Sequence, residues 1–176
     1  MKREVLVLMG GSSREREISF LTGKACCAAL KKKKYKIRKL DAKGEFILKL
    51  KKIKPKLVFN ALHGKYGEDG FIQSILESLK IPYTHSGIYS SSLAMDKVLS
   101  RVIFKKNKIN VPKYFVTHSE NENNVESKIK FPLVIKPINE GSSLGVYICR
   151  NKKQFNKNFK TLKKNYKKII VKKYIP

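Results

Sequence analysis

The sequence predicts an α/β protein whose first half is a doubly wound parallel sheet. Two apolar runs, residues 5–9 and 57–59, contain no charged side chain and lead toward glycine loops, as strands buried on both faces do. Apolar residues three and four positions apart then indicate amphipathic helices. Strand and helix signals alternate from residue 5 to residue 84, which is typical of a parallel sheet covered by helices.

The first half is expected to hold four strands, at residues 5–9, 35–40, 57–60 and 81–84. A helix follows each of the first three strands, and the second of these helices is short, at residues 46–52. Ser12 or Ser13 is expected to cap the first helix. Its first turn then holds Glu15 and Glu17, where the helix dipole favours acidic residues. The face predicted to pack inward carries Ile18, Leu21, Ala25 and Ala28.

Glycine and serine crowd residues 86–92, so we place a domain boundary there and expect domains at 1–92 and 93–176. The second domain is expected to open with a helix that begins at Asp96 and Lys97 and carries an apolar stripe of Met95, Val98, Leu99, Val102 and Ile103. Strands are predicted at residues 111–116, 131–137, 146–149 and 169–171, with polar loops at 119–124 and 139–145. A basic helix carries Phe155, Phe159, Leu162 and Tyr166 on one face.

The composition of the chain bears on whether it binds nucleic acid, in which compartment it functions and whether it enters a membrane. The formal charge is +27, and such an excess can indicate a nucleic-acid partner. Here lysine supplies most of it and is dispersed, without clustered arginines or interleaved aromatic residues, which argues against nucleic acid. The three cysteines form no paired framework, so a reducing cytoplasm is expected. The first apolar run is too short for a signal peptide or a membrane span.

Residues 63–74 form a glycine-rich segment between a predicted strand and a predicted helix. Glycine recurs at 64, 67 and 70, and the helix that follows has its apolar face at Ile72, Ile75, Leu76 and Leu79. Glu68 and Asp69 are expected in the first turn of that helix. A loop at this position brings backbone N–H groups to the carboxyl edge of the sheet. The pattern also fits a structural loop with an Asp cap and a locally bonded His63.

Lys136 ends an apolar strand, where burial of its ammonium group is costly unless an anion meets it. A phosphate is the natural anion, because Ser142, Ser143 and neighbouring glycines lie a few residues on. Alternatively, the long side chain reaches solvent past the strand. No glycine-rich run ends in Gly-Lys-Ser or Gly-Lys-Thr, so a P-loop is excluded.

These segments resemble the D-alanine–D-alanine ligases, a branch of the ATP-grasp superfamily. The glycine loop matches that family's signature at His63, Gly67, Glu68, Asp69, Gly70, Gln73 and Ser74. Other landmarks follow in the family's order across essentially the whole chain: Gly10-Gly11, Glu15-Arg16-Glu17, Ser19, Tyr83, Gly87, Met95-Asp96-Lys97, residues 134–137 and residues 140–145. The resemblance implies an α/β substrate domain followed by the front part of an ATP-grasp domain of α+β class.

The resemblance implies ligation of two D-alanines through an acyl phosphate formed from ATP, for peptidoglycan synthesis. Glu15 and Ser142 are the expected catalytic residues: Glu15 binds the ammonium of the first D-alanine and positions Ser142, while His63 lies beside the same substrate. ATP is expected to meet Lys97 and Lys136 at its phosphates, with Ser143 closing over them. Adenine is expected to pair with the backbone of a hinge formed by Lys173, Tyr174 and Ile175.

Two departures from the family bear on activity. Lys172 stands where the family usually has glutamate, and the family continues for a comparable length beyond residue 176. The Mg²⁺ ligands are expected in that further part, so no metal ligand is assigned here. We expect a partial chain, inactive alone, and a homodimer is one assembly that the resemblance allows. Two alternatives stay open: a basic polyanion-binding module on the same fold, and a ligase with another second substrate such as D-lactate.

Overall fold

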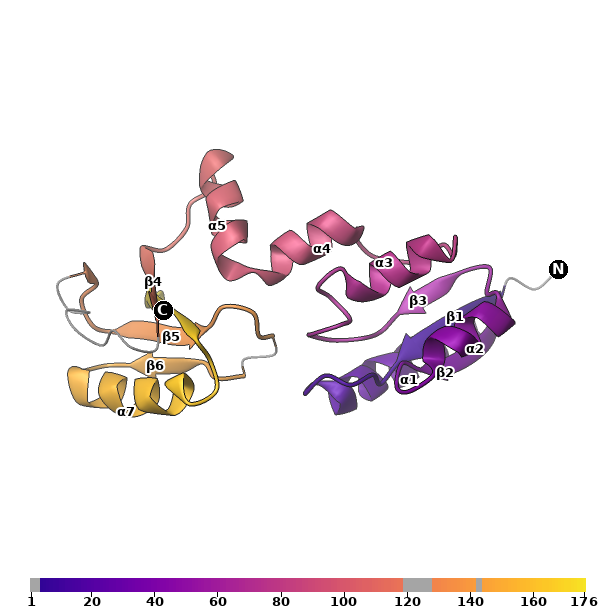
Figure 1. Cartoon of the computed structure of the whole chain (residues 1–176), viewed down its shortest axis with the longest axis horizontal. Coiled ribbons are helices and arrows are strands. Elements are labelled where there is room, and N and C mark those ends of the chain that lie inside the picture. Colours follow the sequence, from indigo (N-terminus) through magenta and orange to yellow (C-terminus); the bar gives the residue numbers. More distant parts are fainter. Residues whose placement is uncertain (1–3, 119–127, 142–143) are drawn as a thin grey trace. The chain divides into compact units, whose positions relative to one another are not determined.

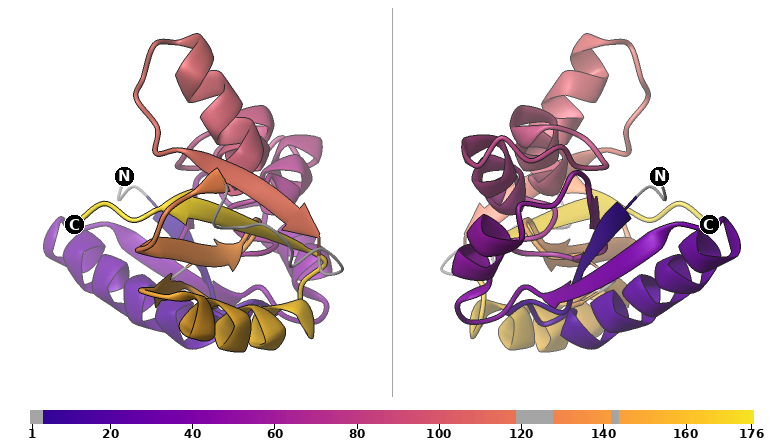
Figure 2. Two further views of the ribbon diagram at one scale, coloured as in Figure 1. Left: turned by 90° about the vertical axis from the view of Figure 1, so that its left-hand side faces the viewer. Right: turned by 90° about the vertical axis from the view of Figure 1, so that its right-hand side faces the viewer.

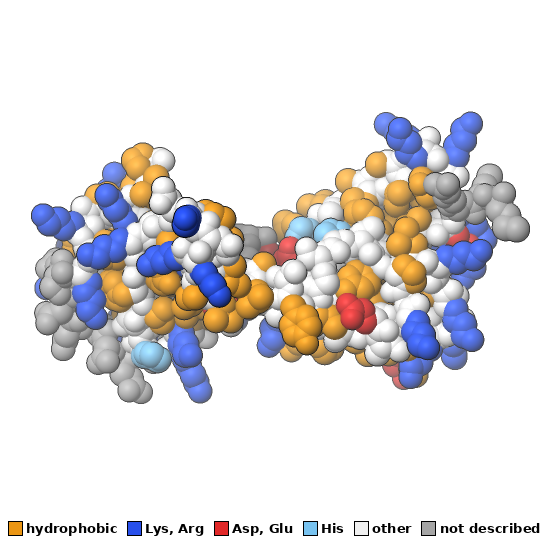
Figure 3. All heavy atoms as spheres, turned by 90° about the horizontal axis from the view of Figure 1, so that it is seen from above, with side chains coloured by type: hydrophobic (Ala, Val, Ile, Leu, Met, Phe, Trp, Pro, Cys, Tyr) orange, Lys and Arg blue, Asp and Glu red, His pale blue; other side chains and the backbone are white. Residues whose placement is uncertain are grey.

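The computed structural model describes residues 4–118, 128–141 and 144–176. The chain divides into two compact units, Met1–Ala94 and Met95–Pro176. Within the described residues, no helix combines the length and apolar character needed to cross a membrane. Lysine and arginine side chains are scattered over the visible face of each unit, with apolar and polar atoms between them (Figure 3).

The first unit contains a three-stranded parallel sheet in the order β2-β1-β3 (Figure 1). Its elements are β1 (Glu4–Met9), α1 (Arg16–Lys32), β2 (Lys36–Asp41), α2 (Phe46–Ile53), β3 (Val58–Asn60), α3 (Phe71–Ser78) and α4 (Ile88–Met95). The central strand β1 pairs with both neighbours, and Leu8 lies opposite Leu40 on one side and Asn60 on the other. The predicted α/β class with a parallel first sheet is therefore confirmed.

Helices cover both faces of this sheet because the side chains of β1 alternate. Leu6 and Leu8 pack in one cluster with residues of α2 and α3, including Leu50, Ile72 and Leu76. Val7 and Met9 point to the other face, where they pack with Cys27 of α1 and Ala61. Figure 2 (right) shows α1 running along this sheet. All four β1 side chains are at most 5% exposed, as expected of a central strand covered on both sides.

The predicted inward face of α1 is wrong. Ile18 and Leu21 are 46% and 61% exposed, and Ala25 and Ala28 are exposed as well. The helix instead packs through small residues spaced four apart: Ser19, Gly23 and Cys27. A Cβ on Gly23 would lie 2.8 Å from the Cβ of Met9, so the backbone of α1 lies against β1. Close backbone approach selects small residues, which a search for large apolar side chains misses.

Two predicted helix starts are also displaced. Helix α1 begins at Arg16, with Glu15 at the N-cap position, and Ser13 lies outside it. Helix α3 begins at Phe71 after Gly70, whose φ of 93° lies in the left-handed region. Glu68 and Asp69 therefore precede the helix, and their carboxylates bond backbone N–H groups of the loop. Glu68 and Asp69 therefore stabilise the turn before α3, whereas Glu17 lies in the first turn of α1 as predicted.

The segment after α3 also differs from the prediction. Residues 81–84 form no full strand, because only Tyr83 makes an isolated parallel bridge, to Val58. The proline before it has no N–H to donate to a ladder. The glycine- and serine-rich segment at which we placed the domain boundary contains helix α4 (Ile88–Met95).

The second unit contains a four-stranded antiparallel sheet in the order β4-β7-β5-β6. Its elements are α5 (Lys97–Lys106), β4 (Tyr114–His118), β5 (Leu133–Pro137), β6 (Tyr147–Cys149), α7 (Lys152–Lys163) and β7 (Lys168–Lys173). Asp96 lies at the start of α5 as predicted, and its side chain caps the helix by accepting bonds from the N–H groups of Val98 and Leu99. The apolar stripe of α5 is not buried: Leu99 and Val102 are 47% and 54% exposed.

Helix α7 covers one face of this sheet (Figure 2, left). Phe155, Phe159 and Leu162 are at most 2% exposed and pack on Leu133, Ile135, Ile169 and Val171. The predicted apolar face of this helix is confirmed. Because strand side chains alternate, Val134, Lys136 and Lys172 lie on the opposite face of the sheet.

Candidate functional site

Two loops meet at the carboxyl edge of the parallel sheet. One follows β1 and begins with Gly10 and Gly11, and the other follows β3 and contains His63 and Gly64. β1 and β3 are neighbours, so loops leaving the same edge lie side by side. This is the edge at which a doubly wound sheet usually binds ligands.

Ser13 ties the two loops together. Its Oγ donates a hydrogen bond to the carbonyl oxygen of His63 at 2.8 Å. Ser13 Oγ also accepts a hydrogen bond from the backbone N–H of Glu15, at 3.2 Å. One hydroxyl therefore sets the position of His63 relative to Glu15, two of the three residues predicted for the first substrate.

The carboxylate of Glu15 lies over Gly64. Glu15 is only 5% exposed, and a Cβ added to Gly64 would come 1.9 Å from Glu15 Oε2. Gly64 also has φ of +67°, which a residue with a side chain adopts only with strain. Space and backbone conformation both require glycine here, and the result is a carboxylate held against the His63 loop.

A salt bridge fixes the first loop from the other side. Arg16 NH1 donates to Asp41 Oδ1 at 2.8 Å and NH2 donates to Oδ2 at 2.6 Å. The same two side chains hold Gly11: its N–H donates to Asp41 Oδ1, and its carbonyl accepts from Arg16 NH1 at 2.7 Å. The Arg16 guanidinium holds the pKa of Asp41 below its usual range, although partial burial opposes this.

The His63 loop is fixed internally by its own polar groups. Glu68 Oε2 accepts from the N–H of Gly64 at 2.6 Å. The carbonyl of Gly67 accepts from two buried amide side chains, Asn60 Nδ2 at 2.9 Å and Gln73 Nε2 at 3.1 Å. The loop therefore presents a defined shape to the sheet edge, and Glu68 contributes to that shape.

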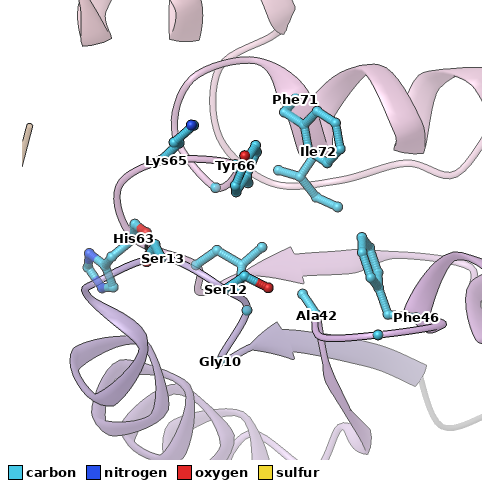
Figure 4. Close-up of a pocket in the computed structure, with 14 residues that line it drawn as sticks. Gly10, Ser12, Ser13, Ala42, Phe46, His63, Lys65, Tyr66, Phe71 and Ile72 are labelled. Atoms are coloured by element: carbon cyan, nitrogen blue, oxygen red, sulfur yellow. Dashed lines mark hydrogen bonds between the residues drawn. The ribbon is translucent and has the colours of Figure 1, made fainter. Parts of the chain in front are cut away.

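Two pockets open on the loops, and His63 lines both. The first has a volume of about 210 Å³ and is walled by Gly10, Ser13, Phe46, Tyr66, Phe71 and Ile72 among others (Figure 4). The second has a volume of about 350 Å³, and its lining is more polar, with Thr22, Asn60, Glu68, His85 and Ser91. In Figure 4 the His63 ring lies beside Ser13, at the mouth of the loop that carries Lys65 and Tyr66.

The face of the antiparallel sheet opposite α7 is cationic. Lys172 lies directly across from Val134, so Lys136 is its diagonal neighbour on the same face. Arg101 of α5 stacks over Tyr114, which is paired with Lys172. Burial is the main cause, and together with repulsion from Lys172, Lys97 and Arg101 it lowers the pKa of Lys136 to about 8.

Anions suit this face on physical grounds. Arg101 Nε is buried and has no hydrogen-bond partner among the described residues. Burial also lowers the pKa of Arg101, and it lowers the pKa of Lys172, to which Arg101 adds repulsion. Cations that repel one another in a partly buried place are stabilised by a bound anion such as a phosphate.

Lys97 and the end of β7 have protein partners of their own. Lys97 Nζ donates to the carbonyls of Ile138 and Glu140, which joins α5 to the loop after β5. The N–H of Lys173 donates to Lys113 O at 2.9 Å, and the N–H of Tyr174 lies 3.3 Å from Pro132 O. Adenine bound at this segment would therefore have to pair with backbone groups other than these two N–H groups, such as carbonyl oxygens.

Comparison with known proteins gives a consistent result. Two family models match, "D-ala D-ala ligase N-terminus" over residues 39–86 and "D-ala D-ala ligase C-terminus" over residues 103–176. A D-alanine–D-alanine ligase of Pelagibacter ubique is 49% identical over all of this chain and 59% of its own length. One of Wolbachia pipientis is 47% identical over 98% of this chain and 55% of its own.

The chain belongs to the D-alanine–D-alanine ligase family. Solved structures agree: the Bacillus anthracis ligase is 36% identical, with a TM-score of 0.86 over 98% of this chain and 58% of that one. The structure of the same ligase complexed with ATP is 35% identical, with a TM-score of 0.84 over 99% of this chain and 59% of that one. The chain spans about half the length of the curated relatives it matches. The comparisons do not favour the polyanion-binding module or a D-lactate ligase.

Within this chain, the predicted site residues fall into three groups. Glu15 and His63 come together at the edge of the parallel sheet. Lys97, Lys136 and the segment 173–175 belong to the second unit. Ser142 and Ser143 lie outside the described residues. Among the residues that the structure covers, no cluster of three His, Cys, Asp or Glu could hold a metal ion.

Sequence reasoning missed four contributors to these sites. Ser13 was considered only as a helix cap, and Asp41, Thr22 and Arg101 were not singled out. Asp41 had a signal, since it ends the strand beside β1 at the edge where loops gather. Thr22 and Arg101 had none, because each is an ordinary polar residue within a helix.

Proposed function

We propose that this chain supplies the first substrate site and the front of the nucleotide site of an ATP-dependent ligase that joins two D-alanines. The observation that carries the proposal is the contact between the two loops: Ser13 bonds both His63 and Glu15, and Glu15 lies on Gly64. These residues belong to the segments in which the chain resembles the ligases.

In this proposal the first unit binds D-alanine. The Glu15 carboxylate meets the ammonium group, and its burial strengthens the attraction because little water screens it. His63 lies beside the same amino acid and faces its carboxylate. A rigid loop pair matters here, because the carboxylate has to be held in line for attack on a phosphoryl group.

The second unit holds the nucleotide phosphates on its cationic face. ATP supplies the γ-phosphoryl group, which makes the first D-alanine carboxylate an acyl phosphate with a leaving group. Lys136 is the central contact, with Arg101 and Lys172 on the same face. Anion binding stabilises the charged form of Lys136, which the lowered pKa of about 8 makes less favourable than it is in water.

The finer parts of the assignment rest on the family alone. They are a requirement for Mg²⁺ with ligands outside the described residues, a homodimer, a cytoplasmic location, and a role in peptidoglycan precursor synthesis with D-alanine as second substrate. The expected roles of Ser142 at the first substrate and Ser143 over the phosphates belong with them.

Chemical-shift mapping on the ¹⁵N-labelled 176-residue chain tests the proposal. D-alanine should perturb amides of residues 10–15 and 62–68 more than L-alanine does, and ATP should perturb residues 134–137 and 170–174. Glu15→Gln should abolish the D-alanine response, whereas Glu17→Gln, at an exposed position on the same helix, should retain it. Equal responses to both alanines, or responses to neither alanine nor ATP, would overturn the proposal.

A further inference from the structure

The imidazole of His63 is held by a side chain of the first helix. Thr22 Oγ1 lies 2.8 Å from His63 Nε2, which is hydrogen-bond distance. Thr22 lies in the second turn of α1, on the helix that begins directly after Glu15. His63 is thus anchored twice by this part of the chain, at its carbonyl by Ser13 and at its ring by Thr22.

This contact decides which ring nitrogen can serve a ligand. Nε2 is engaged by the protein, so Nδ1 is the nitrogen left to meet a small molecule. In neutral imidazole one nitrogen carries the proton and the other accepts, and the partner of one nitrogen sets the state of the other. The threonine hydroxyl can donate to Nε2 or accept from it, so this contact is compatible with either tautomer of His63. The chemistry of the ligand that meets Nδ1 decides between them.

The chemistry of the substrate favours one of them. This step rests on the proposed function, in which Glu15 meets the ammonium of an amino acid and His63 faces its carboxylate. A carboxylate is an acceptor, so it is matched by an Nδ1–H donor and repelled by an Nδ1 lone pair. We propose that Thr22 is a positioning residue whose hydroxyl donates to Nε2 and thereby holds His63 as the Nδ1–H tautomer.

The position of His63 between the pockets agrees with this role. Thr22 and His63 both line the 350 Å³ pocket, whereas His63 without Thr22 lines the 210 Å³ pocket beside Ser13. A ring free to rotate about its side-chain bonds could present either nitrogen to either pocket. The bond to Thr22 removes that freedom, and the orientation is set before substrate arrives.

Imidazole ¹⁵N NMR of the 176-residue chain tests the tautomer directly. His63→Gln identifies the His63 signals among those of the three histidines. We expect a protonated Nδ1 and a hydrogen-bonded, unprotonated Nε2 in the wild type. Thr22→Val keeps the shape and removes the hydroxyl, so it should convert this pattern to a mixture of tautomers, and Thr22→Ser should restore it. An Nε2–H tautomer in the wild type, or an unchanged pattern in Thr22→Val, would overturn the inference.

D-alanine titrations separate this inference from the proposed function. With the tautomer as inferred, D-alanine should shift the Nδ1 signal, and Thr22→Val should weaken D-alanine binding about fivefold, the effect of one hydrogen bond. If D-alanine leaves His63 unperturbed while Thr22→Val still changes the tautomer, the proposed substrate is wrong and the positioning role of Thr22 stands. If Thr22→Val does not fold, the wild-type and Thr22→Ser spectra still decide which nitrogen is protonated.

Discussion

Arg16 and Asp41 form a two-pronged salt bridge whose members also hold the backbone of Gly11 between them. The shortest contact, Arg16 NH2 to Asp41 Oδ2, is 2.6 Å. The bridge joins the start of α1 to the end of β2, so it sets the loop that precedes Glu15. Its contribution should be visible in the acid stability of the protein.

We expect Asp41→Asn to lower stability at neutral pH and to flatten the acid limb of the stability curve. The pKa of Asp41 is depressed in the folded state, so its contribution is present above the unfolded pKa of about 3.9 and is lost as pH falls through the folded value. Urea midpoints at pH 7 and pH 2.5 measure this. The wild-type advantage should be smaller at pH 2.5 than at pH 7, and an advantage of equal size at both would contradict the prediction.

Gly64→Ala should displace Glu15, and Gly44→Ala is its matched control. Both glycines have positive φ, +67° and +63°, so each alanine incurs about 1 kcal/mol of backbone strain. Only Gly64 has a neighbour in the way, since a Cβ on Gly44 meets nothing within 4 Å. Urea unfolding should show a clearly larger loss for Gly64→Ala, and D-alanine mapping should show a weakened response for that variant alone. Equal losses for the two variants would mean that the Glu15 contact is unimportant.

The face of α1 that packs on the sheet can be tested with Gly23→Ala and Leu21→Ala. Alanine normally stabilises a helix over glycine by about 1 kcal/mol, yet here its methyl group collides with Met9. We expect a net loss of about 1–2 kcal/mol from overpacking. Leu21 is 61% exposed, so Leu21→Ala should change stability by less than about 0.5 kcal/mol. A larger loss of stability for Leu21→Ala than for Gly23→Ala, in calorimetry or urea unfolding, would show that α1 packs on the sheet through its large apolar side chains.

Lys136→Met should stabilise the protein at pH 7, with a gain that shrinks between pH 8 and pH 10. The pKa of Lys136 falls to about 8 in the folded state against about 10.4 when unfolded. Within that window the unfolded chain binds more protons, so wild-type stability rises with pH. The effect should be about 1 kcal/mol or less, because water screens a partly exposed group.

Lys157→Met, at an exposed position on α7, is the control for the change in side-chain type. Its urea midpoint should follow the wild type at every pH between 7 and 10. ATP should reverse the order at pH 7 by stabilising the wild type more than Lys136→Met, since anion binding favours the charged lysine. A difference in stability between Lys136→Met and the wild type that stays constant from pH 7 to pH 10 would contradict the lowered pKa of Lys136.

The order of elements followed from local patterns. Charge-free runs marked β1 and β3, the spacing of Phe155, Phe159 and Leu162 marked the buried face of α7, and Asp96 marked the start of α5. These features depend on neighbours in sequence, through strand alternation, helical period and capping. The family resemblance rested on segments of the same kind, and the comparisons confirmed it.

The tertiary structure alone decided the contacts between distant residues. The sequence by itself determined that the segments carrying Glu15 and His63 follow strands of one parallel sheet. Only the fold showed Ser13 bonded to both residues and Thr22 bonded to the ring of His63, because nothing in the sequence indicates which distant group a hydroxyl side chain contacts. The tertiary structure also decided that α1 contacts the sheet through the face that carries Gly23. Close packing of two backbones depends on which surfaces meet and not on the hydrophobicity of either one.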